Sequence, residues 1–235
     1  FNYRIMQLPV NFSKLTLRKM YKTYTQTNKR YFFFDYENTL FQTEDEEYAL
    51  NEKESRMNLH KPTTEIIHIL DKLLTDPRNE VYIITGRQRK YLDGWFGNVK
   101  GIGLGAEYGF FYRKCRSESS YNMGQYETMF AIKNWSWKET VENIFKSFTD
   151  KTEGSRYCNK ESTITWVYGN CSQEFGHTQA NELKTHLSNV IPDDTQLDVV
   201  MGMDYVEVKP RNLNKGYFIS HILEQDVMKG VKPEF

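Results

Sequence analysis

The sequence predicts an α/β fold in which a Rossmann-like parallel sheet carries an inserted α+β cap. Two apolar runs, 31–34 and 81–84, are separated by a helical pattern, and each is followed at once by polar residues. This strand–helix–strand order is typical of a parallel sheet, whose buried strands are apolar on both faces. Later in the chain, helical and alternating stretches follow one another without this repeat, which indicates a separate α+β unit.

The first half of the chain supplies the predicted sheet. Its strands are short apolar runs, and its helices show apolar residues at helical spacing, with Pro62 at the start of one of them. The charged stretch between the first strand and that helix is predicted to be a loop. In order, the elements are helix 15–24, strand 31–34, loop 43–60, helix 63–74, strand 81–84 and strand 102–104.

The second half supplies the predicted cap and a return to the sheet. The cap elements are helix 135–148, strand 162–168, helix 176–187 and strands 198–201 and 205–208, and the returning helix is 217–223. The chain is therefore divided into a lead-in and two units. They are a lead-in helix and linker (1–27), a sheet core (28–113 and 209–235) and the cap (114–208).

The composition limits the class of protein. Of 235 residues, 39% are hydrophobic, which is enough for a sizeable core, and 31 basic residues balance 31 acidic ones. A neutral chain has no electrostatic attraction to nucleic acid or to an anionic membrane, and no apolar run approaches the roughly 18 residues that a membrane span needs. Three cysteines without a paired motif argue against a disulfide framework or a zinc site. We expect a cytoplasmic protein, and the missing initiating Met indicates a piece of a longer one.

Asp35 is the first candidate for chemistry, because it ends a buried strand at the edge where parallel sheets bind ligands. A carboxylate there can attack phosphorus and form an aspartyl-phosphate. Glu37, two residues later, can protonate the leaving oxygen and then deprotonate water, and Mg²⁺ would neutralise the phosphate charge. The alternative is an ordinary solvent-facing turn after a strand.

Thr85 and Lys215 add to this prediction. The Thr85 hydroxyl follows the next parallel strand and can donate a hydrogen bond to a phosphoryl oxygen, and the Lys215 ammonium can pair with both nucleophile and phosphate. Each is weak evidence alone, because Thr-Gly-Arg after a strand is usually a turn and a lysine at a helix start is usually solvated. The ordered combination with Asp35 is specific, and it predicts that the three side chains converge at one crevice.

Six segments match, in the same order, the motifs of one known family. They are FDYENTL (34–40), IITGR (83–87), WFG (95–97), GAEYGFFYR (105–113), EFGHTQA (174–180) and VEVKP with NKG (206–210 and 214–216). The sequence thus resembles the trehalose-6-phosphate phosphatase family of the haloacid-dehalogenase superfamily, whose motifs are DYDGTL, ISGR or ITGR, WFG, AEHGFWYR, EFGxxQA and VEVRP followed by NKG. The resemblance covers nearly the whole chain and implies a haloacid-dehalogenase-type core with an inserted cap.

Two departures fall in the first motif. Glu37 stands where the family has its acid/base Asp, and misplacing a catalytic group by about 1 Å can cost around 10²-fold in rate. Asn38 stands where the family has glycine, and its cost is smaller in the right-handed helical region and larger at positive φ. The family's last acidic motif, GDDxTDE, which supplies Mg²⁺ ligands, is absent from the chain, and Asp193-Asp194 is no substitute because it precedes Lys215.

The cap departs from the family as well. Segments 158–160 and 167–169 read CNK and VYG where the family has the sugar-contacting ExK and HYR. The substrate contacts that the resemblance carries over are Lys160, Tyr168, Glu207 and Lys209. Because other groups that hold the sugar are missing, we expect weak binding of trehalose.

The resemblance also implies a degenerate catalytic set and a metal. The catalytic residues would be Asp35, Glu37, Thr85 and Lys215. If the domain is active, Mg²⁺ would be held by the Asp35 carboxylate and the backbone carbonyl of Glu37, with its remaining ligands outside this chain.

Three functions stay open at this point. The one we favour is a catalytically impaired phosphatase-like domain that acts as a regulatory or structural part of a trehalose-synthesising complex. The second is an active Mg²⁺-dependent trehalose-6-phosphate phosphatase that tolerates Glu37, and the third is a phosphatase for another phosphorylated metabolite. The resemblance implies trehalose-6-phosphate synthase and phosphatase subunits as partners, and an upstream glycosyltransferase-like domain is common in the family.

Overall fold

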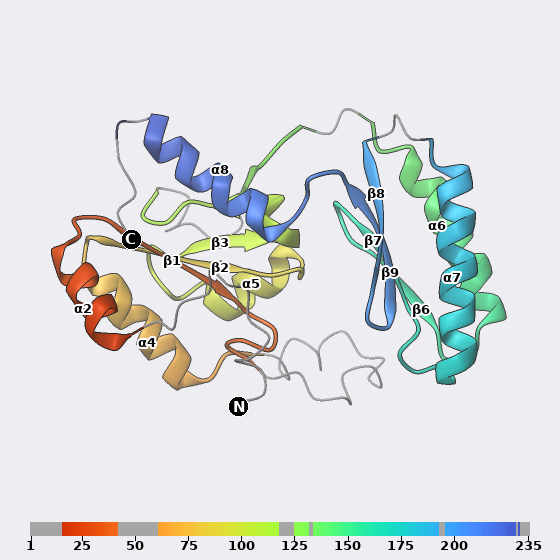
Figure 1. The fold of residues 1–235 in the computed structure, drawn as a ribbon, viewed down its shortest axis with the longest axis horizontal. Coiled ribbons are helices and arrows are strands. Elements are labelled where there is room, and N and C mark those ends of the chain that lie inside the picture. Colours follow the sequence, from red (N-terminus) through yellow and green to blue (C-terminus); the bar gives the residue numbers. More distant parts are fainter. Residues whose placement is uncertain are drawn as a thin grey trace.

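The computed structural model describes residues 16–41, 61–117, 125–131, 134–192, 196–228 and 230. Within these ranges the chain forms two sheets, and each sheet has its own hydrophobic cluster and its own helices (Figure 1). The predicted loop 43–60 and the pair Asp193-Asp194 lie outside the described residues. No helix in the described ranges has the length and apolar character needed to cross a membrane.

The first sheet contains the predicted parallel strands. Its strands, in spatial order, are β1 (Arg30–Asp35), β2 (Asn79–Ile84), β3 (Gly103–Ala106), β4 (Phe111–Arg113) and β5 (Glu127–Thr128). The first three run parallel, with Asp35 opposite Ile84 and Ile84 opposite Gly105, and β4 and β5 extend the sheet in antiparallel fashion. The three strands predicted for this sheet are confirmed, with small shifts at their ends.

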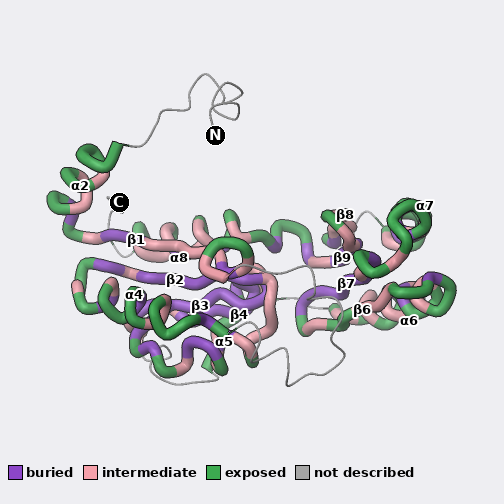
Figure 2. Tube along the Cα trace, turned by 90° about the horizontal axis from the view of Figure 1, so that it is seen from below, coloured by how far each residue is buried: buried purple, intermediate pink, exposed green. Residues whose placement is uncertain are grey.

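Helices cover both faces of the first sheet. α4 (Thr64–Thr75) and α5 (Arg89–Phe96) lie on one side and α8 (Lys215–Met228) on the other (Figure 1, Figure 2). α2 (Leu17–Gln26) precedes β1, and the short 3₁₀ turn η2 (Glu107–Gly109) joins β3 to β4. The predicted start of α4 is confirmed, because the Thr63 hydroxyl accepts a hydrogen bond from the Ile66 N–H at 3.3 Å and caps the helix.

The end of β1 divides its side chains between the core and the open edge of the sheet. Tyr36 is fully buried and packs on Trp95 and Phe96 of α5, with ring centroids 4.9 and 5.5 Å apart. Asp35, one residue earlier, points the opposite way because successive side chains of an extended strand alternate, and it stays partly exposed. Packing of the Tyr36 ring therefore directs the Asp35 carboxylate toward the carboxyl edge of the sheet.

The second sheet forms the cap predicted as an α+β unit. Its antiparallel strands, in spatial order, are β6 (Arg156–Asn159), β7 (Ile164–Val167), β9 (Tyr205–Pro210) and β8 (Leu197–Gly202). α6 (Trp137–Lys151) and α7 (Gln173–Val190) cover the face that is turned away from the first sheet (Figure 1). Trp166 is fully buried under these helices together with Phe145 and Leu183, so the cap has a core of its own.

Several elements were not predicted: α5, β6, and the short β4 and β5 with the turn η2 before them. α5 contains Gly94 and several polar residues, and β6 is a half-exposed edge strand, so neither has a clear apolar period. Strand β5 still pairs with β4, beyond the predicted start of the cap at residue 114. We therefore propose that the two units are joined at 129–136 and again at 211–214.

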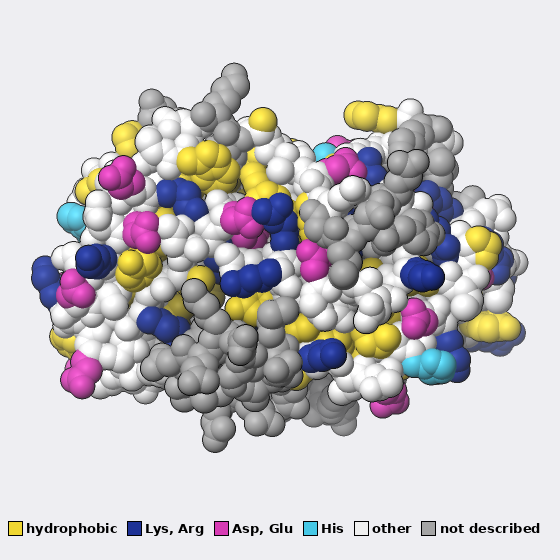
Figure 3. All heavy atoms as spheres, turned by 180° about the vertical axis from the view of Figure 1, so that it is seen from behind, with side chains coloured by type: hydrophobic (Ala, Val, Ile, Leu, Met, Phe, Trp, Pro, Cys, Tyr) yellow, Lys and Arg dark blue, Asp and Glu magenta, His cyan; other side chains and the backbone are white. Residues whose placement is uncertain are grey.

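Charged side chains are mixed over the molecular surface. The face shown in Figure 3 intersperses basic and acidic groups and gathers neither sign into a large patch. This distribution agrees with the balanced composition of 31 basic and 31 acidic residues.

Candidate active site

Asp35 and Lys215 form an ion pair across 180 residues of sequence. Lys215 Nζ lies 2.6 Å from Asp35 Oδ1. Lys215 reaches this position because it opens α8, whose first turn is capped when the Asn214 side chain accepts a hydrogen bond from the Tyr217 N–H at 2.8 Å. An ammonium beside a carboxylate at a strand end can balance the charge of both a nucleophile and an incoming phosphoryl group.

Thr85 and Glu37 are in direct contact at the same edge of the sheet. Thr85 Oγ1 lies 2.8 and 2.9 Å from the two Glu37 carboxylate oxygens, to which it can donate one hydrogen bond. Arg87 Nε donates to Glu37 Oε1 at 2.8 Å, and the Arg87 backbone N–H donates to Thr85 Oγ1 at 3.0 Å. Glu37 therefore engages the hydroxyl that we predict to bind a phosphoryl oxygen.

Asn38 has a positive φ and not a right-handed helical conformation, and positive φ was expected to be the costlier of these two for a residue other than glycine. Its φ is 58°, in the left-handed region, where the related motif has glycine. Among residues with a side chain, Asn is one of the best tolerated there. The backbone of this turn is therefore maintained with modest strain, and Glu37 is the more consequential of the two departures.

The predicted catalytic residues lie in two contacting pairs. One pair is Asp35 with Lys215, and the other is Glu37 with Thr85. The pairs are neighbours because Asp35 and Glu37 are two residues apart and because β1 and β2 end in register. Their chemical roles remain a prediction.

The described residues do not form a metal site by themselves. Asp35 is paired with Lys215, and the Glu37 carboxylate bonds Thr85 and Arg87. In the described ranges, no group of three or more His, Cys, Asp or Glu residues could hold a metal ion. The donors present here thus do not fit Mg²⁺ on their own, and we derive no step that passes through a metal.

A buried carboxylate on the cap faces this edge of the core. Glu207 of β9 is only 1% exposed and accepts a hydrogen bond from the Thr165 hydroxyl at 3.0 Å. Lys160 Nζ and Lys209 Nζ lie 3.6 and 4.0 Å from its oxygens. Three of the four predicted substrate contacts are therefore gathered into one cluster, in which a carboxylate and two ammonium groups can meet polar groups of a ligand.

Tyr108 connects this cap cluster to the core, and sequence reasoning assigned it no role. Its hydroxyl donates to Glu207 Oε1 at 3.3 Å, and the Lys209 ammonium lies 4.7 Å from its ring centroid. Burial raises the pKa of Tyr108 well above its usual value, and the Glu207 carboxylate raises it further, so the phenol stays protonated and donates. A Cβ on Gly86 would lie 3.1 Å from the ring, so a glycine there leaves room for it beside Thr85.

Tyr168, the fourth predicted substrate contact, lies elsewhere. It is 7% exposed and stacks on Trp166 in the cap's hydrophobic cluster, with ring centroids 5.5 Å apart. Side chains alternate along β7, so Thr165 faces Glu207 while Trp166 and Tyr168 face the helices. The structure therefore does not bring Tyr168 to the cluster around Glu207.

Glu107 joins the two units and also went unassigned. It is fully buried, with φ 48°, and its carboxylate accepts hydrogen bonds from the backbone N–H groups of Glu161 and Ser162 at 3.3 and 2.7 Å and from the Ser162 hydroxyl. Arg89 of α5 also pairs with Glu161. The signal available in the sequence was a carboxylate directly after the apolar strand β3, within a segment that resembles a family motif.

The arrangement of a parallel sheet with an inserted α+β cap is the fold of haloacid-dehalogenase-like proteins. A haloacid dehalogenase-like hydrolase from B. subtilis has the same fold at 11% identity, with a TM-score of 0.53 over 83% of this chain and 78% of that one. The C-terminal domain of the Candida albicans trehalose synthase regulatory protein also has this fold, at 18% identity and with a TM-score of 0.64 over 95% of this chain and 76% of that one.

More specifically, the chain belongs to the trehalose-phosphatase family, whose model matches residues 33–235. The C-terminal domain of C. albicans trehalose-6-phosphate phosphatase is similar at 29% identity and a TM-score of 0.74, covering 92% of this chain and 69% of that one.

Curated relatives extend beyond the matched region. α,α-Trehalose-phosphate synthase (UDP-forming) 5 of Arabidopsis thaliana is 32% identical over 99% of this chain and 25% of its own length. The trehalose-phosphatase of Schizosaccharomyces pombe is 32% identical over 89% of this chain and 24% of its own length. The chain thus spans about a quarter of the length of these relatives.

Proposed function

We propose that this chain is a phosphatase-like domain of trehalose metabolism whose own hydrolysis of trehalose 6-phosphate is impaired, and that it acts as a regulatory or structural part of a trehalose-synthesising assembly. The observation that carries this proposal is the contact of the Glu37 carboxylate with Thr85 and Arg87. A carboxylate bound to the phosphate-binding hydroxyl opposes a second anion at the same place, because like charges at short range repel.

The position of Glu37 also makes it a poor general acid. A general acid must reach the leaving oxygen of the substrate. Here both carboxylate oxygens are engaged by Thr85, and one of them also by Arg87. In our proposal, protonation of the leaving oxygen and deprotonation of water both become slower, because both need this group.

An active phosphatase is the alternative that a specific observation favours. The pair formed by Asp35 and Lys215 is intact at 2.6 Å, and a relative named trehalose-phosphatase is 32% identical over most of the chain. In this alternative the incoming phosphoryl group displaces Glu37 from Thr85, and Mg²⁺ would have to be held by Asp35 together with ligands outside the described residues. A phosphatase for a different phosphate ester is the third possibility.

The deciding experiment measures phosphate release from trehalose 6-phosphate by the full-length protein with Mg²⁺ present. We expect no release above that of an Asp35→Asn variant, which keeps the shape of the side chain but removes the nucleophile. Release that depends on Asp35 would contradict the proposal in favour of the active phosphatase. Parallel assays with p-nitrophenyl phosphate test the third possibility.

The same proposal includes partners and a compartment. The relatives named trehalose-phosphate synthase and trehalose-phosphatase support a place beside synthase and phosphatase subunits. Three free cysteines, one of them exposed, support a reducing compartment such as the cytoplasm. Co-purification of the tagged full-length protein with synthase activity tests the first point.

A further inference from the structure

A cavity of about 420 Å³ lies where the chain passes between core and cap. We call it the hinge cavity, and the lining residues used below are Phe130, Trp137, Gln196, Arg211, Asn212 and Tyr217. None of the predicted catalytic residues lines it. Its volume falls within the roughly 300–1,000 Å³ that is common for small-molecule sites.

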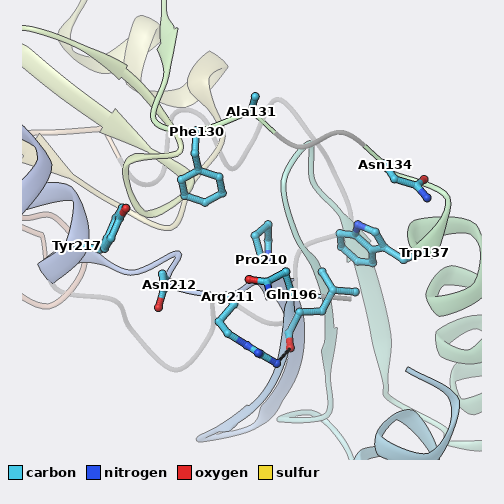
Figure 4. A pocket seen from close by; sticks show the side chains of 10 residues that line it. Phe130, Ala131, Asn134, Trp137, Gln196, Pro210, Arg211, Asn212 and Tyr217 are labelled. Carbon is cyan, nitrogen blue, oxygen red and sulfur yellow. Dashed lines mark hydrogen bonds between the residues drawn. The ribbon is translucent and has the colours of Figure 1, made fainter. Parts of the chain in front are cut away.

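Aromatic rings from both units face the hinge cavity. Trp137, the first residue of α6, stands on the cap side, and Phe130 and Tyr217 stand on the core side (Figure 4). Phe130 and Tyr217 meet edge to face, with ring centroids 6.4 Å apart. Trp137 Nε1 is buried and has no hydrogen-bond partner among the described residues, a state that is unfavourable unless a bound group accepts its proton.

Side-chain amides and a strained backbone border the same space. Gln196 and Asn212 both line the cavity and both have positive φ, 58° and 68°. Asn adopts this region readily, but Gln does not, and strain of this kind is kept where it positions a group for function. The backbone N–H of Arg211 donates a hydrogen bond to the Gln196 carbonyl at 2.7 Å. This bond keeps Gln196 close to Asn212, the residue that follows Arg211.

The charges around the hinge cavity are balanced. Arg211 is the one lining residue with a formal charge among those described, and its Nε lies 3.4 Å from Asp198 Oδ1. An anionic ligand would therefore gain little, because the arginine charge is already compensated. Flat rings that present apolar faces, together with amide groups that both donate and accept, suit a ligand with many hydroxyl groups and no charge.

We propose that the hinge cavity binds an uncharged carbohydrate, with a pyranose ring held between Trp137 and Tyr217 and its hydroxyl groups bonded by the Gln196 and Asn212 amides. A sugar bound there touches both units and thereby favours one arrangement of cap and core. The inference is independent of whether the domain hydrolyses trehalose 6-phosphate, since it uses none of Asp35, Glu37, Thr85 and Lys215.

The test titrates the full-length protein with maltose and, separately, with inorganic phosphate, and follows binding by saturation-transfer NMR. We expect saturable maltose binding that phosphate does not displace. Trp137→Ala and Gln196→Gly should each weaken it by at least about tenfold, because one removes a stacking surface and the other an amide. Gln196→Gly suits the positive φ, so a loss of binding there does not reflect unfolding.

Matched variants separate the site from the fold. Asp204→Gly alters another residue at positive φ, 61°, and Trp135→Phe alters the neighbouring indole; both should bind maltose as the wild type does. The proposal is overturned if maltose shows no saturable binding, or if phosphate competes with it. It is equally overturned if binding persists in Trp137→Ala and Gln196→Gly but is lost in Glu207→Gln, which would place the sugar in the crevice beside Tyr108.

Discussion

Glu37 is bound by Thr85, whose hydroxyl lies 2.8 and 2.9 Å from the two oxygens of the Glu37 carboxylate. The longer side chain allows this contact, because an extra methylene carries the carboxyl group farther from the backbone than Asp would. Arg87 holds the same carboxylate from a second direction at 2.8 Å. In the function that we propose, this one departure from the family motif has two consequences, a misplaced acid and an occupied anion site.

Shortening the acid tests the first consequence. Glu37→Asp combined with Asn38→Gly should give the full-length protein measurable turnover of p-nitrophenyl phosphate with Mg²⁺, but not of trehalose 6-phosphate. The nucleophile and acid act on the phosphoryl group that every substrate shares, whereas lost sugar contacts misplace only the natural substrate. Glycine at position 38 suits the observed φ of 58°.

The control for this pair of changes adds Asp35→Asn, which should abolish any restored turnover. Restored hydrolysis of trehalose 6-phosphate would show that the cap still holds the sugar and that our interpretation of its missing contacts is wrong. Absence of activity on both substrates would indicate a missing metal ligand.

Removing the carboxylate tests the second consequence. In Glu37→Ala the Thr85 hydroxyl and the Arg87 guanidinium lose their internal anion, so inorganic phosphate should bind about tenfold more tightly than to the wild type. Isothermal titration calorimetry measures the difference. The matched control Glu139→Ala removes a carboxylate from the exposed face of α6 and should leave phosphate affinity unchanged. Equal affinity in wild type and Glu37→Ala would show that Glu37 does not compete.

Cys115 offers a test of the core that is independent of function. Burial raises the pKa of its thiol to about 12, and the thiol donates to the Gly101 carbonyl at 3.0 Å. At about pH 8, iodoacetamide should therefore alkylate the exposed Cys158 and spare Cys115 in the native protein, since the thiolate is the nucleophile. Mass spectrometry of the labelled peptides checks this, and rapid native labelling of Cys115 would contradict the burial.

The raised pKa of the Cys115 thiol also predicts how the stability of the fold depends on pH. Because the folded thiol keeps its proton above the pKa of the unfolded one, near 9, its stabilising contribution is complete below that pH and is lost as pH rises toward about 12. Urea unfolding of the wild type and of Cys115→Ala over this range should show the steeper loss in the wild type.

Sequence reasoning located the parts of the site that follow from strand order. The apolar strands β1 and β2 and the polar residues after them were enough to place Asp35 and Thr85 at one edge. Tyr168 was placed by motif alignment alone, and the alternation along β7 turns it to the helices. Glu107 and Tyr108 were missed because their partners, Ser162 and Glu207, are more than 50 residues away, and only the packing of cap on core brings them together.

Glu107 should be the residue that holds the loop before β7 against the core. Glu107→Leu replaces both acceptor oxygens with methyl groups, so the buried N–H and hydroxyl of Ser162 are left without this partner at a cost of about 1–3 kcal/mol. Hydrogen exchange should then become faster at the Ser162 amide and remain unchanged at Leu104, inside the core sheet. The exposed Glu174→Leu is the matched control and should alter neither amide. Unchanged protection of Ser162 in Glu107→Leu would show that other contacts, such as Arg89 with Glu161, are sufficient to keep the cap against the core.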